Sequence, residues 1–299
     1  MTPESAYLAA EGRLPELLSE LGETPLLVLD RLVLSSSPPR PLCWAQNVWE
    51  DPRLVPFASI SGGANALRAL QRNWALYPVA AHRRAALIES KLPPLPRRPL
   101  PFPSLLPRAP MGSWTLLDER TLLAAPRCSS PFPHGEVGFV EDREGPPNRA
   151  YLKLWEALTL LGEVPRPGER CLDLGSSPGG WTWALARLGA TVVSVDKAPL
   201  DPGVAAMEGV TFRQQSAFSV DPAAEGAFDW LFCDVVCYPA RLLALVRRWR
   251  EAAAARRFVC TLKFQGETDH AAAAAFAALP GARLVHLHHN KHELTLLLG

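Results

Sequence analysis

The chain has 299 residues, of which 48% are hydrophobic and 20% are charged, a composition that excludes wholesale disorder and is sufficient for a buried core. Its 31 basic and 30 acidic residues leave a net charge of +1, which argues against a uniformly basic nucleic-acid-binding protein. The sequence has no apolar run of the roughly eighteen residues that a membrane span needs, no secretory leader, and no CxxC pair among its six cysteines. We therefore expect a cytoplasmic protein with no membrane association, no disulfide framework and no metal site.

Residues 1–136 are predicted to form a smaller, irregular α+β domain. Positions 93–110 hold eight prolines among eighteen residues, and proline excludes both a helix interior and a central strand because it lacks a backbone N–H. This stretch should be an extended connector, although an SH3-type ligand has the same composition. The other elements expected here are a helix at 15–21, a strand at 26–34, helices at 64–76 and 80–91, and a strand with a following turn within 114–123.

The basic residues are unevenly distributed. From Arg53 to Arg127 there are eleven Lys or Arg and only three acids, an excess that can attract a phosphate backbone but that also fits a solvated, arginine-rich surface. Arginine supplies 26 of the 31 basic residues. A lysine kept in such a chain is a candidate for a role in which the side chain loses its proton, which arginine cannot do. The five lysines are Lys91, Lys153, Lys197, Lys263 and Lys291.

Residues 137–299 are predicted to form a doubly wound α/β domain. Strands and helices alternate, which favours a mostly parallel sheet with helices on both faces, and a tight final turn makes the last two strands antiparallel. Ligands of such sheets bind beyond the carboxyl ends of the strands, so the polar residues there are candidate site residues. The expected strands are 137–140, 170–174, 191–195, 210–213, 230–233, 258–262, 284–288 and 294–298; the expected helices are 151–161, 181–188, 240–255 and one containing 271–275.

The segment CLDLGSSPGGW (171–181) places Asp173 in a strand and three glycines in the turn that follows. A dinucleotide fingerprint, GxGxxG, has glycine where this chain has Ser177, so a nicotinamide cofactor is disfavoured. The loop instead fits an amino-acid moiety without a phosphate, and Asp196, at the end of the next strand, is placed to accept hydrogen bonds from a ribose diol. Together these features favour S-adenosylmethionine as cofactor, and a glycine turn that only connects strand to helix is the alternative.

Five segments of the chain carry a family resemblance: DLGSSPGGWTWAL (173–185), NRAYLKLWEA (148–157), FDWLFCDVVCYPARL (228–242), FVCTLKF (258–264) and HNKHELTLLL (289–298). They resemble the FtsJ/RrmJ-type RNA ribose 2′-O-methyltransferases, and within them the RlmM-type branch, which modifies a cytidine ribose of bacterial large-subunit ribosomal RNA. The first resembles the first motif of that family, and the other four resemble the motifs that carry its Lys–Asp–Lys–Glu tetrad. The resemblance implies a Rossmann-like class I methyltransferase domain that acts on RNA, in particular 23S ribosomal RNA. The implied catalytic residues are Lys153, Asp234, Lys263 and Glu293.

The same resemblance extends the set of cofactor-binding residues. In the family an acid usually follows the third strand near the adenine amino group, whereas this chain has Ser216, which can form a hydrogen bond but carries no charge. The N-terminal half departs further, because only LCWAQNVW (42–49) resembles the RlmM-type RNA-binding region, so a complete THUMP module is not expected. The implied cofactor-binding residues are Asp173, Gly175, Ser176, Ser177, Pro178, Gly179, Gly180, Trp181, Asp196, Ser216 and Asp234.

The chemistry of 2′-O-methylation requires a group that accepts the proton of the ribose hydroxyl. A free lysine has a pKa near 10.4, and burial beside a second ammonium lowers such a value. Lys263 is the expected base and Lys153 its like-charge neighbour, with the two acids holding both in place. The alternative for these four residues is that they form two ordinary Lys–carboxylate pairs. For the protein as a whole, the alternatives are a non-catalytic RNA-binding or assembly module and a methyltransferase for another acceptor.

Two further features leave alternatives open. His286 and His288 share a face if residues 284–288 form a strand, but no acid or cysteine accompanies them at a metal-site spacing, so contact of the neighbouring His289 or His292 with RNA phosphate is favoured over metal binding. Tyr238, just beyond Asp234, lines the nucleotide pocket or fills a loop.

Overall fold

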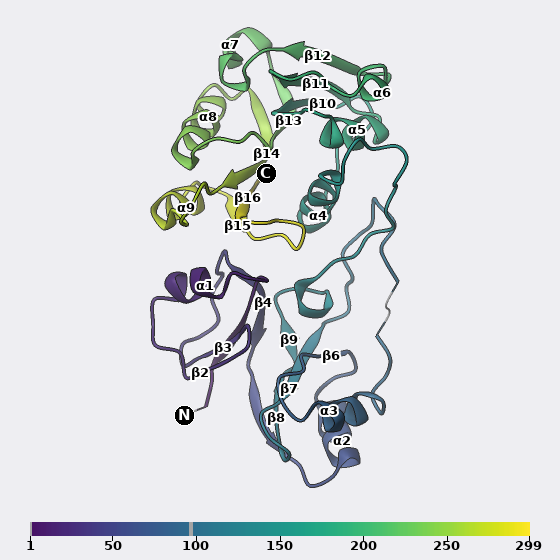
Figure 1. Cartoon of the computed structure of the whole chain (residues 1–299), viewed down its shortest axis with the longest axis vertical. Coiled ribbons are helices and arrows are strands. Elements are labelled where there is room, and N and C mark those ends of the chain that lie inside the picture. The colour runs from purple at the N-terminus through teal and green to yellow at the C-terminus, as the bar shows by residue number, and fades with distance from the viewer. Residues whose placement is uncertain (1, 96–97) are drawn as a thin grey trace. The chain divides into compact units, whose positions relative to one another are not determined.

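The computed structural model describes residues 2–95 and 98–299 (Figure 1). Pro96 and Arg97, which fall within the predicted connector, lie outside the described residues. The backbone divides into two compact units. One comprises residues 1–100 and 106–138, and the other comprises residues 101–105 and 139–299.

The N-terminal unit contains two sheets. In the first, of order β2-β3-β1-β4-β9, the fully buried strand β1 pairs antiparallel with β3 and β4. The second has the order β5-β8-β7-β6, and α2 and α3 pack on it through Leu67, Ala85 and Ile88, which share a core with Trp114 and Leu122. The elements are β1 (Ser5–Ala9), α1 (Leu14–Leu21), β2 (Leu27–Leu29), β3 (Leu32–Ser35), β4 (Ala45–Glu50), β5 (Arg53–Pro56), α2 (Ile60–Leu70), β6 (Trp74–Leu76), α3 (His82–Glu89), β7 (Gly112–Leu116), β8 (Thr121–Ala125) and β9 (Arg127–Cys128).

Two predictions for this unit are wrong. The strand expected at 26–34 is a hairpin of β2 and β3, because Asp30 takes a positive φ of 54° and reverses the chain. The helix expected at 64–76 ends at Leu70, and the last residues of that range form β6. Gln71 is extended, and its side-chain amide bonds to both the N–H and the C=O of Asn73, which gives the backbone an alternative to the next helical turn.

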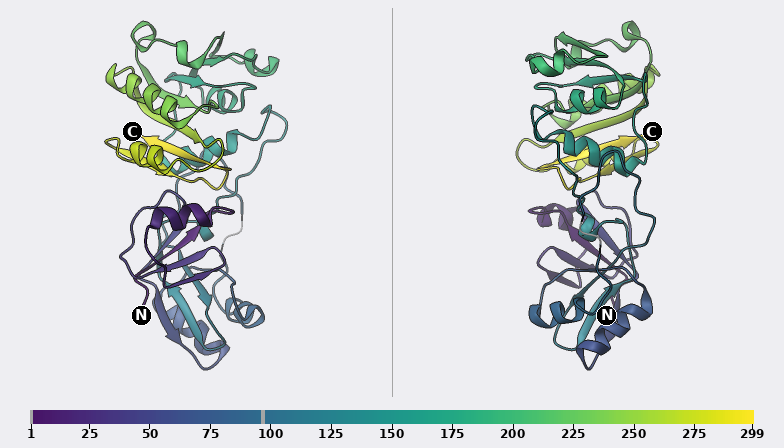
Figure 2. Two further views of the ribbon diagram at one scale, coloured as in Figure 1. Left: turned by 60° about the vertical axis from the view of Figure 1, so that its left-hand side comes forward. Right: turned by 90° about the vertical axis from the view of Figure 1, so that its right-hand side faces the viewer.

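The C-terminal unit is a seven-stranded sheet of order β12-β11-β10-β13-β14-β16-β15. The first five strands are parallel, and β16 lies antiparallel between β14 and β15, as predicted for a doubly wound fold with antiparallel final strands. Helices cover both faces, α4 and α5 on one and α8 and α9 on the other (Figures 1 and 2). The elements are α4 (Tyr151–Leu161), β10 (Arg170–Leu174), α5 (Gly180–Arg187), β11 (Thr191–Asp196), α6 (Pro202–Ala205), β12 (Val210–Gln214), α7 (Pro222–Glu225), β13 (Phe228–Cys233), α8 (Pro239–Glu251), β14 (Ala255–Lys263), α9 (His270–Ala277), β15 (Ala282–Val285) and β16 (Glu293–Leu298).

Two predicted strands of the second half are wrong. Residues 137–140 follow a single 3-10 turn (Pro133–Gly135) and form no strand beyond one isolated bridge residue, Phe139; the Gly138 carbonyl accepts a hydrogen bond from the Leu100 N–H (2.8 Å). Strand β15 ends at Val285, so residues 286–292 form a loop, and the shared strand face expected for His286 and His288 does not exist. Among the described residues, no helix is long and apolar enough to cross a membrane.

Candidate active site

The carboxyl ends of three neighbouring strands bring the motif residues together. The N–H of Asp234, the residue after β13, bonds to the carbonyl of Leu174 at the end of β10 (3.1 Å), which fixes the Asp234 backbone at the centre of the sheet edge. Lys263 ends β14, and its backbone pairs directly with Glu293, the first residue of the antiparallel β16. The antiparallel strand therefore places a glutamate beside a lysine at the edge where parallel strands present their last residues.

The fourth residue comes from helix α4. Lys153 Nζ lies 3.2 Å from Asp234 Oδ1 and 2.7 Å from Glu293 Oε1. Lys263 Nζ lies 3.0 Å from the same Asp234 Oδ1 and donates to the Asp234 carbonyl over 2.6 Å. The structure thus brings all four predicted residues into one network of two ammonium groups and two carboxylates, with Asp234 bridging the two lysines.

The two lysines differ in their surroundings. Burial of Lys153 lowers its pKa, but the carboxylates of Asp234 and Glu293 outweigh burial and raise the pKa of Lys153 above its ordinary value. Its side chain is 10% exposed, whereas that of Lys263 is 21% exposed. Lys153 is therefore held as a cation, and Lys263 is the more exposed of the two amines.

The glycine-rich loop passes close to Val235, the residue that follows Asp234. Gly175 has φ 78°, and its N–H bonds to the Val195 carbonyl at the end of β11 (2.9 Å). A Cβ at Gly175 would lie 2.7 Å from Val235 Cα, a contact that neither backbone can relieve without moving. Glycine at this position therefore lets the loop approach the residue next to Asp234.

Gly175→Ala is expected to weaken S-adenosylmethionine binding at least tenfold and to lower the free energy of unfolding by about 1–3 kcal/mol, because it combines a left-handed backbone with a backbone clash. Isothermal titration with the cofactor and urea unfolding measure the two effects. Gly168→Ala is the matched control, since Gly168 has φ 83° but nothing within 4 Å of an added Cβ. Equal effects of the two substitutions would show that the contact with Val235 is unimportant.

Asp196 and Ser216 occupy the tips of the neighbouring strands. Asp196 Oδ2 accepts from the Ser177 N–H (3.0 Å) and Oδ1 from the Ala198 N–H (2.9 Å), so the carboxylate is held against the glycine-rich loop and keeps lone pairs for a diol. Ser216 caps a short 3-10 turn by accepting from the Phe218 N–H (3.3 Å). The roles of both residues in cofactor binding stay predictions.

Three other residues of the predicted cofactor set have structural partners. Trp181 is buried, and its Nε1 donates to the Ala150 carbonyl (2.9 Å), which joins α5 to the start of α4. A Cβ at Gly180 would lie 2.2 Å from Asn148 Oδ1, so glycine allows this packing. Asp173 is fully buried, and its Oδ2 accepts from the Thr182 hydroxyl (2.7 Å). Burial raises the pKa of Asp173 to about 7.

The loop fits the cofactor that the sequence implies. Asp173 Oδ1 and Ser176 Oγ are buried polar atoms that form no hydrogen bond within the part of the chain that the structure describes. Buried polar atoms without a partner cost free energy, so a ligand that supplies hydrogen bonds would be bound favourably. The polar groups of the loop and the Asp196 carboxylate would hold S-adenosylmethionine, and no phosphate-binding glycine pattern competes with that assignment.

Asp173→Asn is expected to change how stability depends on pH. A carboxyl whose pKa is raised on folding binds an extra proton in the folded state, so its contribution to stability falls as pH rises from about 4 to about 7. The asparagine side chain of the variant does not ionise, so the variant does not lose this stability as pH rises. The free energy of unfolding of the variant, relative to wild type, should therefore rise by an amount on the order of a few kcal/mol between pH 4 and pH 8. A flat difference in urea titrations would contradict the burial of an ionisable Asp173.

Sequence reasoning missed one acid near this site, Glu156, because a glutamate within a helix usually marks a solvated face. Its side chain is buried and accepts hydrogen bonds from the loop that holds His288 and His289. No group of three or more His, Cys, Asp or Glu that could hold a metal ion is found among residues 2–95 and 98–299.

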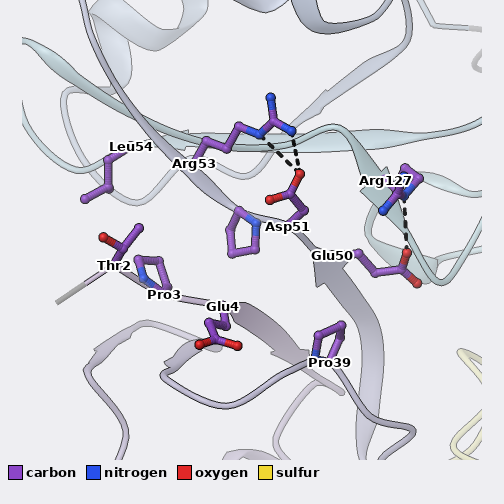
Figure 3. Close-up of a pocket in the computed structure, with 10 residues that line it drawn as sticks. Thr2, Pro3, Glu4, Pro39, Glu50, Asp51, Arg53, Leu54 and Arg127 are labelled. Carbon is purple, nitrogen blue, oxygen red and sulfur yellow. Dashed lines mark hydrogen bonds and ion pairs between the residues drawn. The ribbon is translucent and has the colours of Figure 1, made fainter.

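The N-terminal unit has pockets of its own. One, of about 630 Å³, is lined by Arg53 and Arg127, but each arginine is paired with an acid, Asp51 and Glu50 respectively (Figure 3). Because each arginine is already paired with a carboxylate, this pocket is not suited to binding phosphate. A larger cavity of about 1220 Å³ lies between Trp74, Leu92 and Phe132 and is mostly apolar. Neither pocket contains a residue of the predicted site.

The chain is similar to known methyltransferases. Residues 146–271 match the family model described as FtsJ-like methyltransferase. Ribosomal RNA large subunit methyltransferase M of Halorhodospira halophila is 40% identical over 159 residues, covering 50% of this chain and 46% of the relative. The protein of the same name from Aromatoleum aromaticum is 37% identical over 164 residues, covering 50% of this chain and 44% of the relative.

The chain thus matches somewhat less than half the length of these two relatives. Among solved structures, that of TrmN from Thermus thermophilus aligns over 98% of both chains, with 15% identity and a TM-score of 0.38, a likeness too weak to indicate a function. The segment that matches the family model includes three of the four clustered residues, Lys153, Asp234 and Lys263. The likeness to FtsJ-like methyltransferases therefore spans residues 146–271 and most of the clustered residues.

Proposed function

We propose that the chain is an S-adenosylmethionine-dependent ribose 2′-O-methyltransferase that acts on large-subunit ribosomal RNA. The observation that carries the proposal is the Lys153–Asp234–Lys263–Glu293 network, which is joined by three ion pairs of 2.7–3.2 Å at the edge of the sheet where the glycine-rich loop turns. The relatives named above, which are ribosomal RNA large subunit methyltransferases, support the choice of RNA.

The residues of the network have different roles in the proposed reaction. S-adenosylmethionine supplies an activated methyl group when bound. Lys263 Nζ accepts the proton of the attacking 2′-hydroxyl, a contribution of about 10²–10⁴-fold for a positioned general base. Lys153 is held as a cation by its two carboxylates, and Asp234 orients both amines.

Exposed side chains in each unit support a nucleic-acid acceptor. Tyr238 follows Asp234 by four residues and is 69% exposed, so its ring is available to stack on a base and does not fill the loop. In the N-terminal unit, which we propose recruits the RNA, the basic side chains are spread over α2, α3 and the connector. The exposed ones in the described residues include Arg68, Arg72, Arg83, Lys91, Arg98 and Arg108.

The proposal is tested by incubating the purified chain with labelled S-adenosylmethionine and ribosomal RNA from cells that lack its gene. Labelled ribose 2′-O-methyl groups in the large-subunit RNA, at a position that is unmodified only in those cells, are the expected result. Cofactor binding without transfer to any RNA would favour a non-catalytic RNA-binding or assembly protein. Transfer to transfer RNA, protein or a small molecule, with none to ribosomal RNA, would favour another acceptor.

A further inference from the structure

The buried carboxylate of Glu156 clamps the loop that leads into β16. Glu156 lies on α4 and is 2% exposed. Its Oε1 accepts from the His288 N–H (2.7 Å), and its Oε2 accepts from the His289 N–H (3.0 Å) and from His289 Nδ1 (2.7 Å). A carboxylate only accepts hydrogen bonds, so Nδ1 of His289 carries a proton in this contact. Three donors satisfy an acid that would otherwise be costly to bury.

The same turn of α4 holds the other end of this loop. Lys153 precedes Glu156 by three residues, which places the two side chains on one side of the helix. Lys153 pairs with Glu293, the residue at which the loop ends and β16 begins. Within the loop, Asn290 Nδ2 donates to the Glu293 carbonyl (3.3 Å) and to Thr295 Oγ1 (3.1 Å). One helical turn therefore holds the backbone at residues 288–289 and the carboxylate of Glu293 (yellow loop beside α4, Figure 1).

We propose that Glu156 is a positioning residue: it holds the 286–292 loop against α4 so that the Glu293 carboxylate meets Lys153 in the catalytic network. The inference rests on the proposed methyl transfer. Glu293 is the first residue of β16 and the last to pair with β14, and the Glu156 carboxylate fixes the loop backbone before it to α4. Removing its charge leaves two backbone N–H groups and an imidazole N–H without their acceptor.

Glu156→Gln is expected to lower kcat for RNA methylation about 10- to 100-fold, the scale of a displacement near 1 Å in a catalytic group. The dissociation constant for S-adenosylmethionine should stay within about twofold, because the substitution does not touch the glycine-rich loop or Asp196. Glu163→Gln is the matched control. In the C-terminal unit Glu163 pairs with Arg257, whose guanidinium lies 2.5 and 2.9 Å from its two carboxylate oxygens. The substitution therefore also removes the charge of a paired acid, and it should leave kcat unchanged.

A double-mutant comparison separates positioning from a structural role. In a Glu293→Gln background the carboxylate that Glu156 positions is gone, so adding Glu156→Gln should cost less than about threefold in residual kcat. A cost equal to that of the single substitution would overturn the proposal, because Glu156 would then act independently of Glu293. Wild-type kcat for Glu156→Gln would overturn it as well.

Amide hydrogen exchange gives a readout that needs no activity. The amides of His288 and His289 should exchange slowly in the wild-type chain and at least tenfold faster in Glu156→Gln, while those of 294–298 in β16 stay protected. Unchanged exchange at these two amides would show that Glu156 does not hold the loop and would refute the inference whatever the activity. If the wild-type chain methylates no RNA but this exchange pattern is observed, the proposed function fails while the clamp on the loop is supported.

Discussion

Lys263→Arg is expected to lower kcat for RNA methylation by about 10²–10⁴-fold while the chain still folds and binds S-adenosylmethionine. Lys263 Nζ contacts the Asp234 carbonyl and carboxylate, and a guanidinium can keep both contacts and the positive charge. It cannot lose a proton at any pH used in an assay, so it cannot accept one from a ribose hydroxyl. The substitution therefore removes the acid–base chemistry and retains the electrostatics.

The measurement is single-turnover transfer of labelled methyl groups at saturating RNA and cofactor, with the cofactor dissociation constant determined in parallel. Lys91→Arg is the matched control, because Lys91 is an exposed lysine outside the C-terminal unit and should tolerate arginine without loss of kcat. Wild-type turnover in Lys263→Arg would exclude Lys263 as the base. A loss caused only by weaker cofactor binding would assign it to binding instead.

The C-terminal unit could be predicted from sequence because its signals are local. The strands around Leu172, Val193 and Leu231 are short apolar runs bounded by turns, and each ends at or beside a polar residue. Strand ends of a parallel sheet meet at one edge, so the motif order alone predicts that Asp234 and Lys263 converge. The antiparallel β16 then brings Glu293 to the same edge, as its direct pairing with Lys263 shows.

The N-terminal unit could not be predicted to the same extent because its sheets depend on distant partners. Strand β1 has the mixed sequence SAYLA, and its pairing with both β3 and β4 makes all five positions buried. A single left-handed residue, Asp30, divides one apolar run into two strands. Neither feature has a signature in a window of ten residues, since strand formation reflects the tertiary surroundings more than intrinsic propensity.

The role of Glu156 was hidden from the sequence for a related reason. Helix α4 is buried along nearly its whole length, from Tyr151 to Thr159, so its polar residues do not mark a solvated face. An acid at such a position must find donors, and those donors lie more than 130 residues further along the chain, at His288 and His289. The sequence favoured contact of His289 or His292 with RNA phosphate over metal binding, whereas in the structure the His289 side chain and the His288 and His289 N–H groups bond to a buried carboxylate.

Asp234→Asn is expected to be the most damaging single substitution in the network, because it affects stability as well as catalysis. Asp234 Oδ1 lies within 3.2 Å of both Lys153 Nζ and Lys263 Nζ, so one carboxylate forms ion pairs with two ammonium groups. An amide leaves them facing each other with Glu293 as the nearest remaining counterion, at 2.7 Å from Lys153. We expect kcat to fall at least 10²-fold, because neither amine keeps its orientation.

The cost in stability can be bounded. Removing one partner of a buried ion pair costs about 3–5 kcal/mol, and the partial solvent access of these side chains reduces that to about 2–3 kcal/mol. Urea unfolding at pH 7 measures the difference from wild type. Asp51→Asn is the control, because it breaks the exposed pair of Asp51 with Arg53 and should leave stability unchanged within error. Wild-type stability in Asp234→Asn would show that the network does not depend on this carboxylate.

The pH dependence of the stability lost in Asp234→Asn identifies the interaction that is responsible for the loss. The carboxylates raise the pKa of Lys153 on folding, so their stabilisation is fully present below the ordinary lysine value near 10.5 and is lost as pH rises through the higher folded value. The gap in unfolding free energy between wild type and Asp234→Asn should therefore be constant from pH 7 to about pH 10 and narrow above it. A gap that persists unchanged at pH 11 and above would mean that Asp234 stabilises the sheet edge through packing and hydrogen bonding, and that the charge of Lys153 contributes little.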